Sequence, residues 1–116
     1  HERMHEMSIA ESIIRLLQQQ AHEQHFRRVK HVWLLIGPLS MVEVESLRFC
    51  LTAACRGTLA EGAALDIVSP EARACCQQCG EEQPVTSRFD ACVHCGSYRL
   101  QLLQGDEMQV HELEVE

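Results

Sequence analysis

The chain has 116 residues, of which 46% are hydrophobic and only 4% aromatic, and its formal net charge is −7. This length suits one compact unit or two small ones. The longest apolar run, Val32–Ile36, is far shorter than the roughly 20 residues that span a bilayer, and no basic segment followed by an apolar one opens the chain. We therefore expect neither membrane insertion nor secretion.

Charge is unevenly distributed along the chain. Residues 1–60 carry seven basic and six acidic side chains, whereas residues 61–116 carry three basic and eleven acidic ones. Binding to nucleic acid needs a basic surface for the phosphates and usually aromatic platforms for the bases. Because the second half is acidic and poor in aromatics, we expect no nucleic-acid partner.

The first expected element is an amphipathic helix over about residues 8–24. Ser8 and Glu11 have the spacing of a capping box, in which each residue satisfies a free backbone N–H at the start of a helix. The apolar residues expected on one face are Ile9, Ile13, Leu16 and Leu17.

A strand and a second helix follow. The stretch Val29–Ile36 is rich in β-branched and large apolar residues and ends before Gly37-Pro38, which predicts a buried strand. Ser40 and Glu43 repeat the capping-box spacing ahead of apolar residues at helical intervals, and Gly57 stands where a left-handed cap would end the helix. The pattern predicts a helix over about residues 41–56.

The remaining chain predicts two strands separated by an insertion. Leu65, Ile67 and Val68 indicate one strand, and a cysteine-rich module then occupies about residues 71–105. The segment Met108–Val115 predicts the last strand, with a shift of apolar phase near His111-Glu112 that indicates a bulge or sharp twist. The expected fold is therefore α+β, with two helices packed on a small mixed β-sheet and a metal-binding module inserted between its last two strands.

The most specific motif is C-x2-C-x12-C-x2-C, with a glycine after each pair; its members are Cys76, Cys79, Cys92 and Cys95. Two thiolates on a tight turn bind one ion, and two such turns complete a tetrahedron, which favours structural Zn(II). An odd number of cysteines with this spacing is typical of reduced thiols, so we expect a cytoplasmic protein. Two other readings remain: a zinc-ribbon adaptor that binds protein or nucleic acid, and a rubredoxin-like iron electron carrier.

Other cysteines and histidines have less specific patterns. Cys75 precedes Cys76 and is an alternative zinc ligand, although C-x2-C makes a better metal-binding turn than C-x3-C. Cys50 and Cys55 fall on or near the apolar stripe of the second helix and are expected to be small core residues. His94 lies inside the second cysteine pair and is expected to be exposed, with exchange for a thiolate left open. We find no catalytic motif and expect no enzyme.

Residues distributed along the whole chain from Met4 onward resemble the HypA/HybF family, nickel metallochaperones of [NiFe]-hydrogenase maturation. The matching features are Met4-His5-Glu6, Val32–Gly37, Ser40, Leu47 with Phe49, Gly57, Glu61-Gly62, both cysteine pairs and Leu113-Glu114-Val115.

This resemblance implies a nickel-binding α/β domain, residues 4–70 plus 106–116, and a zinc-ribbon domain, residues 71–105. It also implies delivery of Ni(II) to the hydrogenase large-subunit precursor, cooperation with a GTPase of the same pathway, and in some members a role in urease maturation. The sequence leaves a homodimer open.

The candidate nickel ligands lie near the amino end. A histidine second from a free amino terminus offers its imidazole, its own amide and the terminal amine, a nitrogen set that suits Ni(II) better than Zn(II). Met4-His5 has this form only if Met4 is the first residue, and we interpret His1-Glu2-Arg3 as a tag remnant or an N-terminal extension. The resemblance makes His5 the principal ligand, together with the Met4 backbone.

Two carboxylates complete the predicted set. Glu6 is either a nickel ligand or an acid that stabilises the first turn of the helix. Glu43 occupies the position of a further acidic residue near the family's nickel site, and it is also the closing member of the second capping box.

Overall fold

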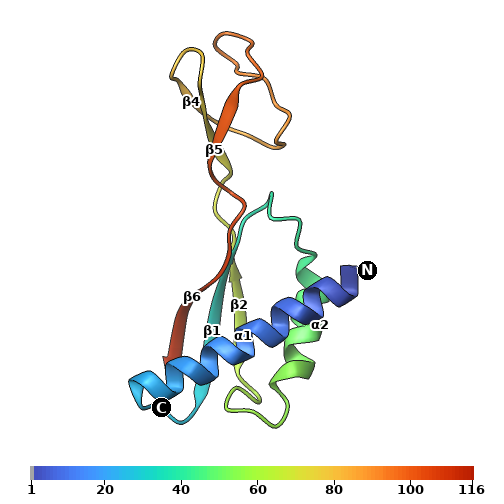
Figure 1. The fold of residues 1–116 in the computed structure, drawn as a ribbon, viewed down its shortest axis with the longest axis vertical. Coiled ribbons are helices and arrows are strands. Elements are labelled where there is room, and N and C mark those ends of the chain that lie inside the picture. The colour runs from blue at the N-terminus through green and yellow to red at the C-terminus, as the bar shows by residue number, and fades with distance from the viewer. Residues whose placement is uncertain (1) are drawn as a thin grey trace. The chain divides into compact units, whose positions relative to one another are not determined.

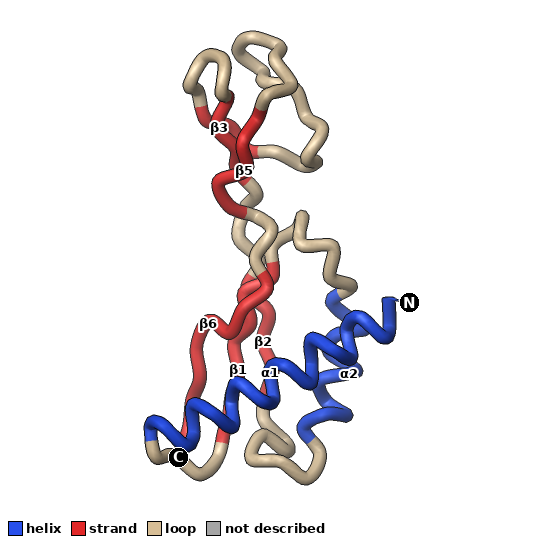
Figure 2. Tube along the Cα trace, viewed as in Figure 1, coloured by secondary structure: helices blue, strands red, loops and turns tan. Residues whose placement is uncertain are grey.

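The computed structural model describes residues 2–116, with side chains from His5 onward, so the expectation for His1 and for the Glu2, Arg3 and Met4 side chains lies outside the described residues. In this part of the chain the elements are α1 (Glu2–Gln24), β1 (Val29–Ile36), α2 (Val44–Cys55), β2 (Ala64–Val68), β3 (Arg73–Cys76), β4 (Glu82–Pro84), β5 (Leu100–Gln104) and β6 (Met108–Val115) (Figures 1 and 2). They form one sheet in the order β2-β1-β6 and another in the order β4-β3-β5. Neither of these helices is both long and apolar enough to cross a membrane.

The chain divides into two compact units. The first contains the chain up to Leu34, Val42–Ile67 and Val110–Glu116; the second contains Leu35–Met41 and Val68–Gln109. The segment Leu35–Met41, expected with the first part, groups with the second. The reason is Leu39, which packs against a buried cluster of Ala72, Ala74 and Val85 and donates its N–H to the Gly105 carbonyl at 2.7 Å.

Helix α1 begins at Glu2, well before the predicted start at Ser8, which lies inside the helix. Residues 2–8 contain neither glycine nor proline, so propensity does not stop the helix there. Its buried face consists of Glu6, Ala10, Ile13, Ile14 and Leu17, positions that share one side of a helix. The prediction for Leu16 was wrong, because that side chain is 40% exposed.

The core of the first unit lies between the two helices and the sheet. Strand β1 has the predicted bounds, and its side chains alternate in burial from Val32 onward. The buried apolar residues that β1 and α2 contribute to this unit are Val29, Val32, Leu34, Leu47, Cys50 and Leu51. Cys50 is thus a core residue, as predicted, whereas Cys55 is half-buried.

Strand β6 runs antiparallel to β1. Arg28 and Glu116 exchange two backbone hydrogen bonds, of 3.1 and 2.9 Å, beside the start of β1. The alternation of β6 is interrupted as predicted at His111 and Glu112, which are consecutive exposed residues. The predicted apolar position at Val115 is wrong, because that side chain is also exposed.

Helix α2 begins at Val44, later than predicted, because Glu43 is the N-cap and Ser40 is not. Ser40 instead lies in a turn, where its N–H donates to the Gly37 carbonyl at 3.1 Å. The predicted end is confirmed: the helix stops at Cys55, and Gly57 has a φ of 75°.

The second unit has a sheet that the sequence did not predict, in which β3 pairs antiparallel with both β4 and β5. At its base three segments cross closely. A Cβ built on Gly37 would lie 2.1 Å from the Gly105 carbonyl oxygen, and one built on Gly105 would lie 2.5 Å from the Ala72 Cβ. The absence of side chains at the two glycines therefore permits the crossing.

Candidate metal centres

The first cysteine turn follows β3. The Gly80 N–H donates to the Cys76 carbonyl at 2.9 Å, and Gly80 has a φ of 82°, a conformation that favours glycine. This turn directs the N–H groups of Gln78 and Cys79 toward the Cys76 sulfur, at 3.3 and 3.4 Å. Glycine after the pair therefore has the role that the sequence indicated.

The second turn repeats this geometry. Gly96, with a φ of 79°, donates its N–H to the Cys92 carbonyl at 2.8 Å, and the His94 N–H lies 3.4 Å from the Cys92 sulfur. Sequence reasoning missed Gln83, which is 4% exposed. Its side-chain amide donates to the Ala91 carbonyl and accepts from the Val93 N–H, at 3.1 and 2.9 Å, and so joins β4 to the second turn.

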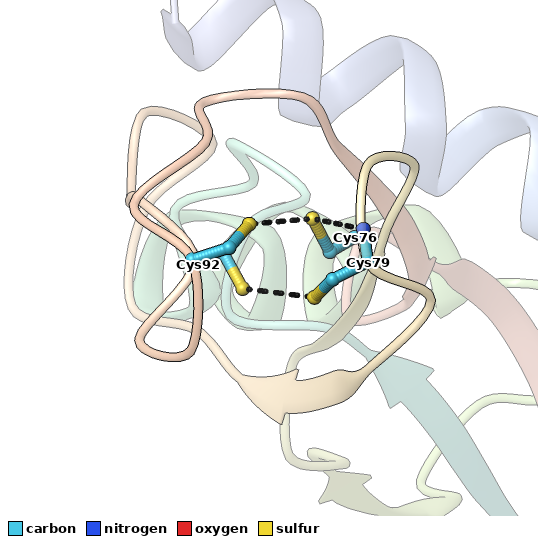
Figure 3. A group of neighbouring side chains, drawn as sticks. Cys76, Cys79 and Cys92 are labelled. Atoms are coloured by element: carbon cyan, nitrogen blue, oxygen red, sulfur yellow. Dashed lines mark hydrogen bonds between the residues drawn. The ribbon is translucent and has the colours of Figure 1, made fainter.

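The two turns bring four sulfurs together (Figure 3). The sulfurs of Cys76, Cys79, Cys92 and Cys95 all lie within 4.8 Å of one another. The Cys76–Cys95 and Cys79–Cys92 pairs are 3.6 and 3.7 Å apart. A tetrahedron with Zn–S bonds of about 2.3 Å requires sulfurs about 3.8 Å apart. The group therefore fits a four-thiolate zinc site.

The thiols in this group affect one another's ionisation. The Cys79 N–H lowers the pKa of Cys76 to about 6, with help from the Gln78 N–H. The Glu81 N–H acts in the same direction on Cys79, but burial and the neighbouring sulfurs prevail and raise its pKa to about 12. The pKa of Cys95 is raised by burial and by Cys76 and Cys92, against a hydrogen bond from Ser97. An ionised thiolate thus makes the ionisation of its neighbours less favourable. A bound cation relieves this repulsion.

The other residues considered as zinc ligands lie outside the four-sulfur group. The Cys75 thiol points to the Cys76 and Gly80 carbonyls, at 3.8 and 3.6 Å, because successive residues of a strand face opposite sides. His94 is exposed and likewise lies outside the four-sulfur group. One further contact was not predicted: His31 lies 2.6 Å from the Asp66 carboxylate and stacks on Trp33.

The predicted nickel ligands are only partly brought together. His5 is exposed, whereas Glu6, the next residue of α1, is 1% exposed. The Oε2 atom of Glu6 accepts the Glu43 N–H at 3.1 Å, and Oε1 is buried without a hydrogen-bond partner among the described residues. Glu43 is itself exposed and caps α2, since its Oε1 accepts the Ser46 N–H at 3.1 Å.

The Glu6 carboxyl thus lies at the amino end of α2, where the helix dipole favours negative charge. A buried carboxylate oxygen is costly to leave unpaired, so native proteins usually provide a hydrogen bond or a cation. Among the described side chains near the amino end, Glu6 is therefore the one whose surroundings fit a metal ligand best. His5 is about 100° away around the helix, so the two side chains point in different directions.

The chain is similar to known proteins along nearly its whole length. The model of the family described as "Hydrogenase/urease nickel incorporation, metallochaperone, hypA" matches residues 4–115. The hydrogenase maturation factor HypA of Azotobacter chroococcum mcd 1 is 62% identical over 113 residues, 97% of this chain and 100% of that protein. The corresponding factor of Azotobacter vinelandii is 58% identical with the same coverage.

Solved structures show the same fold. One described as the solution structure of HypA protein has a TM-score of 0.74 and 26% identity, and covers 97% of this chain and 96% of its own. The Ni metallochaperone HypA from Helicobacter pylori has a TM-score of 0.73 with 24% identity, over 95% of this chain and 96% of its own. The fold, the four-sulfur group and the match along nearly the whole chain show that this protein belongs to the HypA family of nickel metallochaperones for hydrogenase maturation.

Proposed function

We propose that this protein binds Ni(II) near the amino end of α1 and delivers it to the [NiFe]-hydrogenase large-subunit precursor in the cytoplasm. A GTPase of the same pathway cooperates in delivery, and the four cysteines hold Zn(II) as a structural ion. Family membership supports the overall role. The observation that carries the nickel site is the buried Glu6 carboxylate, whose Oε1 has no partner among the described residues.

The proposed ligands are the His5 imidazole, the Met4 backbone, the Glu6 carboxylate and, more peripherally, Glu43. The first four N–H groups of a helix have no acceptor within it, so the amides at the start of α1 are accessible to a ligand role. Because His5 is exposed and Glu6 faces α2, one ion reaches both side chains only when the first turn of α1 opens. Loading therefore rearranges this turn.

Such a site suits an ion that the protein binds only temporarily and passes to an acceptor. Nitrogen and oxygen ligands in the first turn of a helix exchange more readily than four thiolates enclosed by two rigid turns. Transfer then needs only an acceptor that binds Ni(II) more tightly, because about every 1.4 kcal/mol of difference in binding free energy shifts the ratio tenfold. The zinc group has no open position and does not itself pass metal on.

Nickel titration tests the site. Protein beginning at Met4 is compared with the same protein carrying His5→Ala, and we expect about a tenfold or larger loss of affinity, equivalent to roughly 1.4 kcal/mol. The matched control is His25→Ala, which removes another exposed imidazole just beyond α1. Equal affinity and stoichiometry for the His5→Ala protein would remove the proposed site.

Delivery needs a separate test. Cells lacking the endogenous factor are complemented with the wild-type or the His5→Ala protein, and hydrogenase activity is measured at limiting nickel. We expect His5→Ala to fail at limiting nickel and to recover when nickel is in excess. Full activity of this variant at limiting nickel would count against the delivery role, even if titration had confirmed the site.

A further inference from the structure

A small cavity with both apolar and polar walls lies in the second unit. It measures about 170 Å³ and is lined by Ala74, Val85, Ser87, Arg88, Leu100 and Leu102. Its apolar walls belong to the buried cluster of this unit. Pockets for small molecules typically measure about 300–1,000 Å³. This cavity is smaller and suits a single aliphatic side chain.

Arg88 gives the cavity a charged rim. Its Nη2 donates to the Asp106 carboxylate at 3.2 Å and to the Leu39 carbonyl at 3.5 Å. Both side chains of the Arg88–Asp106 pair are about half exposed, at 50% and 49%. An arginine and a carboxylate bind best through two parallel hydrogen bonds. The contact with Asp106 uses one nitrogen, so an incoming carboxylate with better geometry competes for Arg88.

The loop that carries Arg88 also carries an exposed aromatic residue, Phe89, next to it in sequence. The Thr86 N–H donates to the Asp90 carboxylate at 2.8 Å, and the Phe89 N–H donates to the Ser87 hydroxyl at 3.0 Å. Phe89 is nevertheless 86% exposed. Aromatic residues and arginine are both enriched at protein interfaces, and arginine is among the residues that dominate their binding energy.

The charged residue at this cavity indicates the chemistry of the partner that binds there. Residues 61–116 contain only three basic side chains among eleven acidic ones, and one of the three lines the cavity. We propose that the Arg88 surface, which comprises this cavity with Arg88 at its rim, docks an extended segment of a protein partner. In that segment an aspartate or glutamate lies next to an aliphatic residue. The aliphatic side chain enters the cavity, and the carboxylate replaces Asp106 on Arg88.

This docking goes beyond nickel binding and does not depend on the ligands near α1. The net charge of −7 repels an acidic segment at long range, so the local match provides specificity and does not accelerate association. Asp106 acts as an internal competitor. Its removal is therefore expected to strengthen binding, which is the opposite of the effect of removing Arg88.

The test is selection of random dodecapeptides displayed on phage against the zinc-loaded full chain. We expect peptides with an acidic residue next to Leu, Ile or Val. For a selected peptide, fluorescence anisotropy should show about a tenfold loss of affinity with Arg88→Gln, and a severalfold gain with Asp106→Asn. Arg99→Gln, which removes another arginine of the same unit, should leave the affinity unchanged. Zinc content and amide NMR spectra verify that each variant is folded.

Three results would overturn the proposal. One is the absence of enriched peptides, or enrichment of basic ones. Another is equal affinity of the selected peptides for wild-type and Arg88→Gln protein. The third is a concentration-dependent dimer, seen by sedimentation, that Arg88→Gln abolishes, because a second copy would then be the occupant.

Discussion

The two candidate metal regions are built in opposite ways. The cysteine region takes its ligands from two turns of nearly identical geometry, each fixed by a left-handed glycine and by N–H groups directed at sulfur. The region near α1 depends on a contact between residues 37 positions apart, in which Glu6 accepts the Glu43 N–H. The first is specified by local spacing and is closed. The second is specified by helix packing and remains incomplete until a cation or another donor reaches Glu6.

This contrast distinguishes a site that holds its ion permanently from a site that exchanges its ion. Four thiolates at tetrahedral distances leave no position for an acceptor ligand, whereas a site near a helix terminus can open one turn at little cost. The proposed nickel site and the four-cysteine zinc site thus correspond to two different kinds of local structure. Changes that remove one region should leave the other folded.

Removal of zinc has the largest expected effect. Structural zinc contributes on the order of 10 kcal/mol to the folding of small zinc modules. With a chelator, or in Cys92→Ser, we expect amide protection to collapse over Val68–Gln109 and to persist in the α1–α2 core. Hydrogen exchange measured by mass spectrometry provides the readout. Loss of protection throughout the chain would show that the two units do not fold separately.

Acid should weaken the zinc site strongly. In the metal-free form, the pKa values of Cys79 and Cys95 are raised, so both are protonated at neutral pH. Zinc must displace these protons, and its affinity therefore rises with pH and falls as pH is lowered. Calorimetry in buffers of different ionisation enthalpy should detect proton release at pH 7. Binding without proton release would contradict the charge distribution described for the cluster.

Substitutions of Glu6 should separate its structural role from its metal role. Glu6→Ala leaves the Glu43 N–H without its acceptor, at a cost of about 1–3 kcal/mol in unfolding free energy. Glu6→Gln keeps an acceptor and removes a buried charge, so we expect it to be at least as stable as wild type. Its nickel affinity should nevertheless fall. Denaturant unfolding and nickel titration on the same samples test this, and unchanged affinity in Glu6→Gln would make Glu6 purely structural.

Loss of the α2 cap should have a smaller effect. Glu43→Ala removes the side chain that accepts the Ser46 N–H, and N-cap losses typically cost about 0.5–2 kcal/mol. Because the Glu43 backbone N–H remains, its bond to Glu6 should survive. Glu43→Asp, which can still cap the helix, is the matched control. Because Glu43 is proposed as a peripheral ligand, nickel affinity should fall only slightly in Glu43→Ala, and unchanged affinity would remove Glu43 from the proposed set.

The smallest effect is expected for Cys75. Its sulfur faces backbone carbonyls and lies outside the four-sulfur group, so Cys75→Ser should retain about one zinc per chain. Elemental analysis measures the stoichiometry, and thermal unfolding should shift little. Loss of zinc in this variant would instead make Cys75 a ligand.

Local patterns predicted much of this structure. The bounds of β1, the end of α2 at Gly57 and the two cysteine turns depend on residues close in sequence, and their positions were predicted correctly. The starts of α1 and α2 were not. At Ser8 a valid capping pattern lies inside a longer helix, and at Glu43 the cap is set by the path of the preceding loop. The burial of Glu6 and the role of Gln83 depend on distant backbone groups, which no spacing rule reveals.

The glycines of this chain restrict substitution for different physical reasons, so they will tolerate replacement to different degrees. A Cβ on Gly80 or Gly96 would have no atom within 4 Å, so a substitution there costs only the left-handed conformation, about 1–2 kcal/mol, and asparagine is the natural substitute. Gly37 has no such conformational demand, yet even one methyl group would overlap the backbone at Gly105. A saturation mutagenesis scan should therefore recover functional alleles at the two turns and none at Gly37.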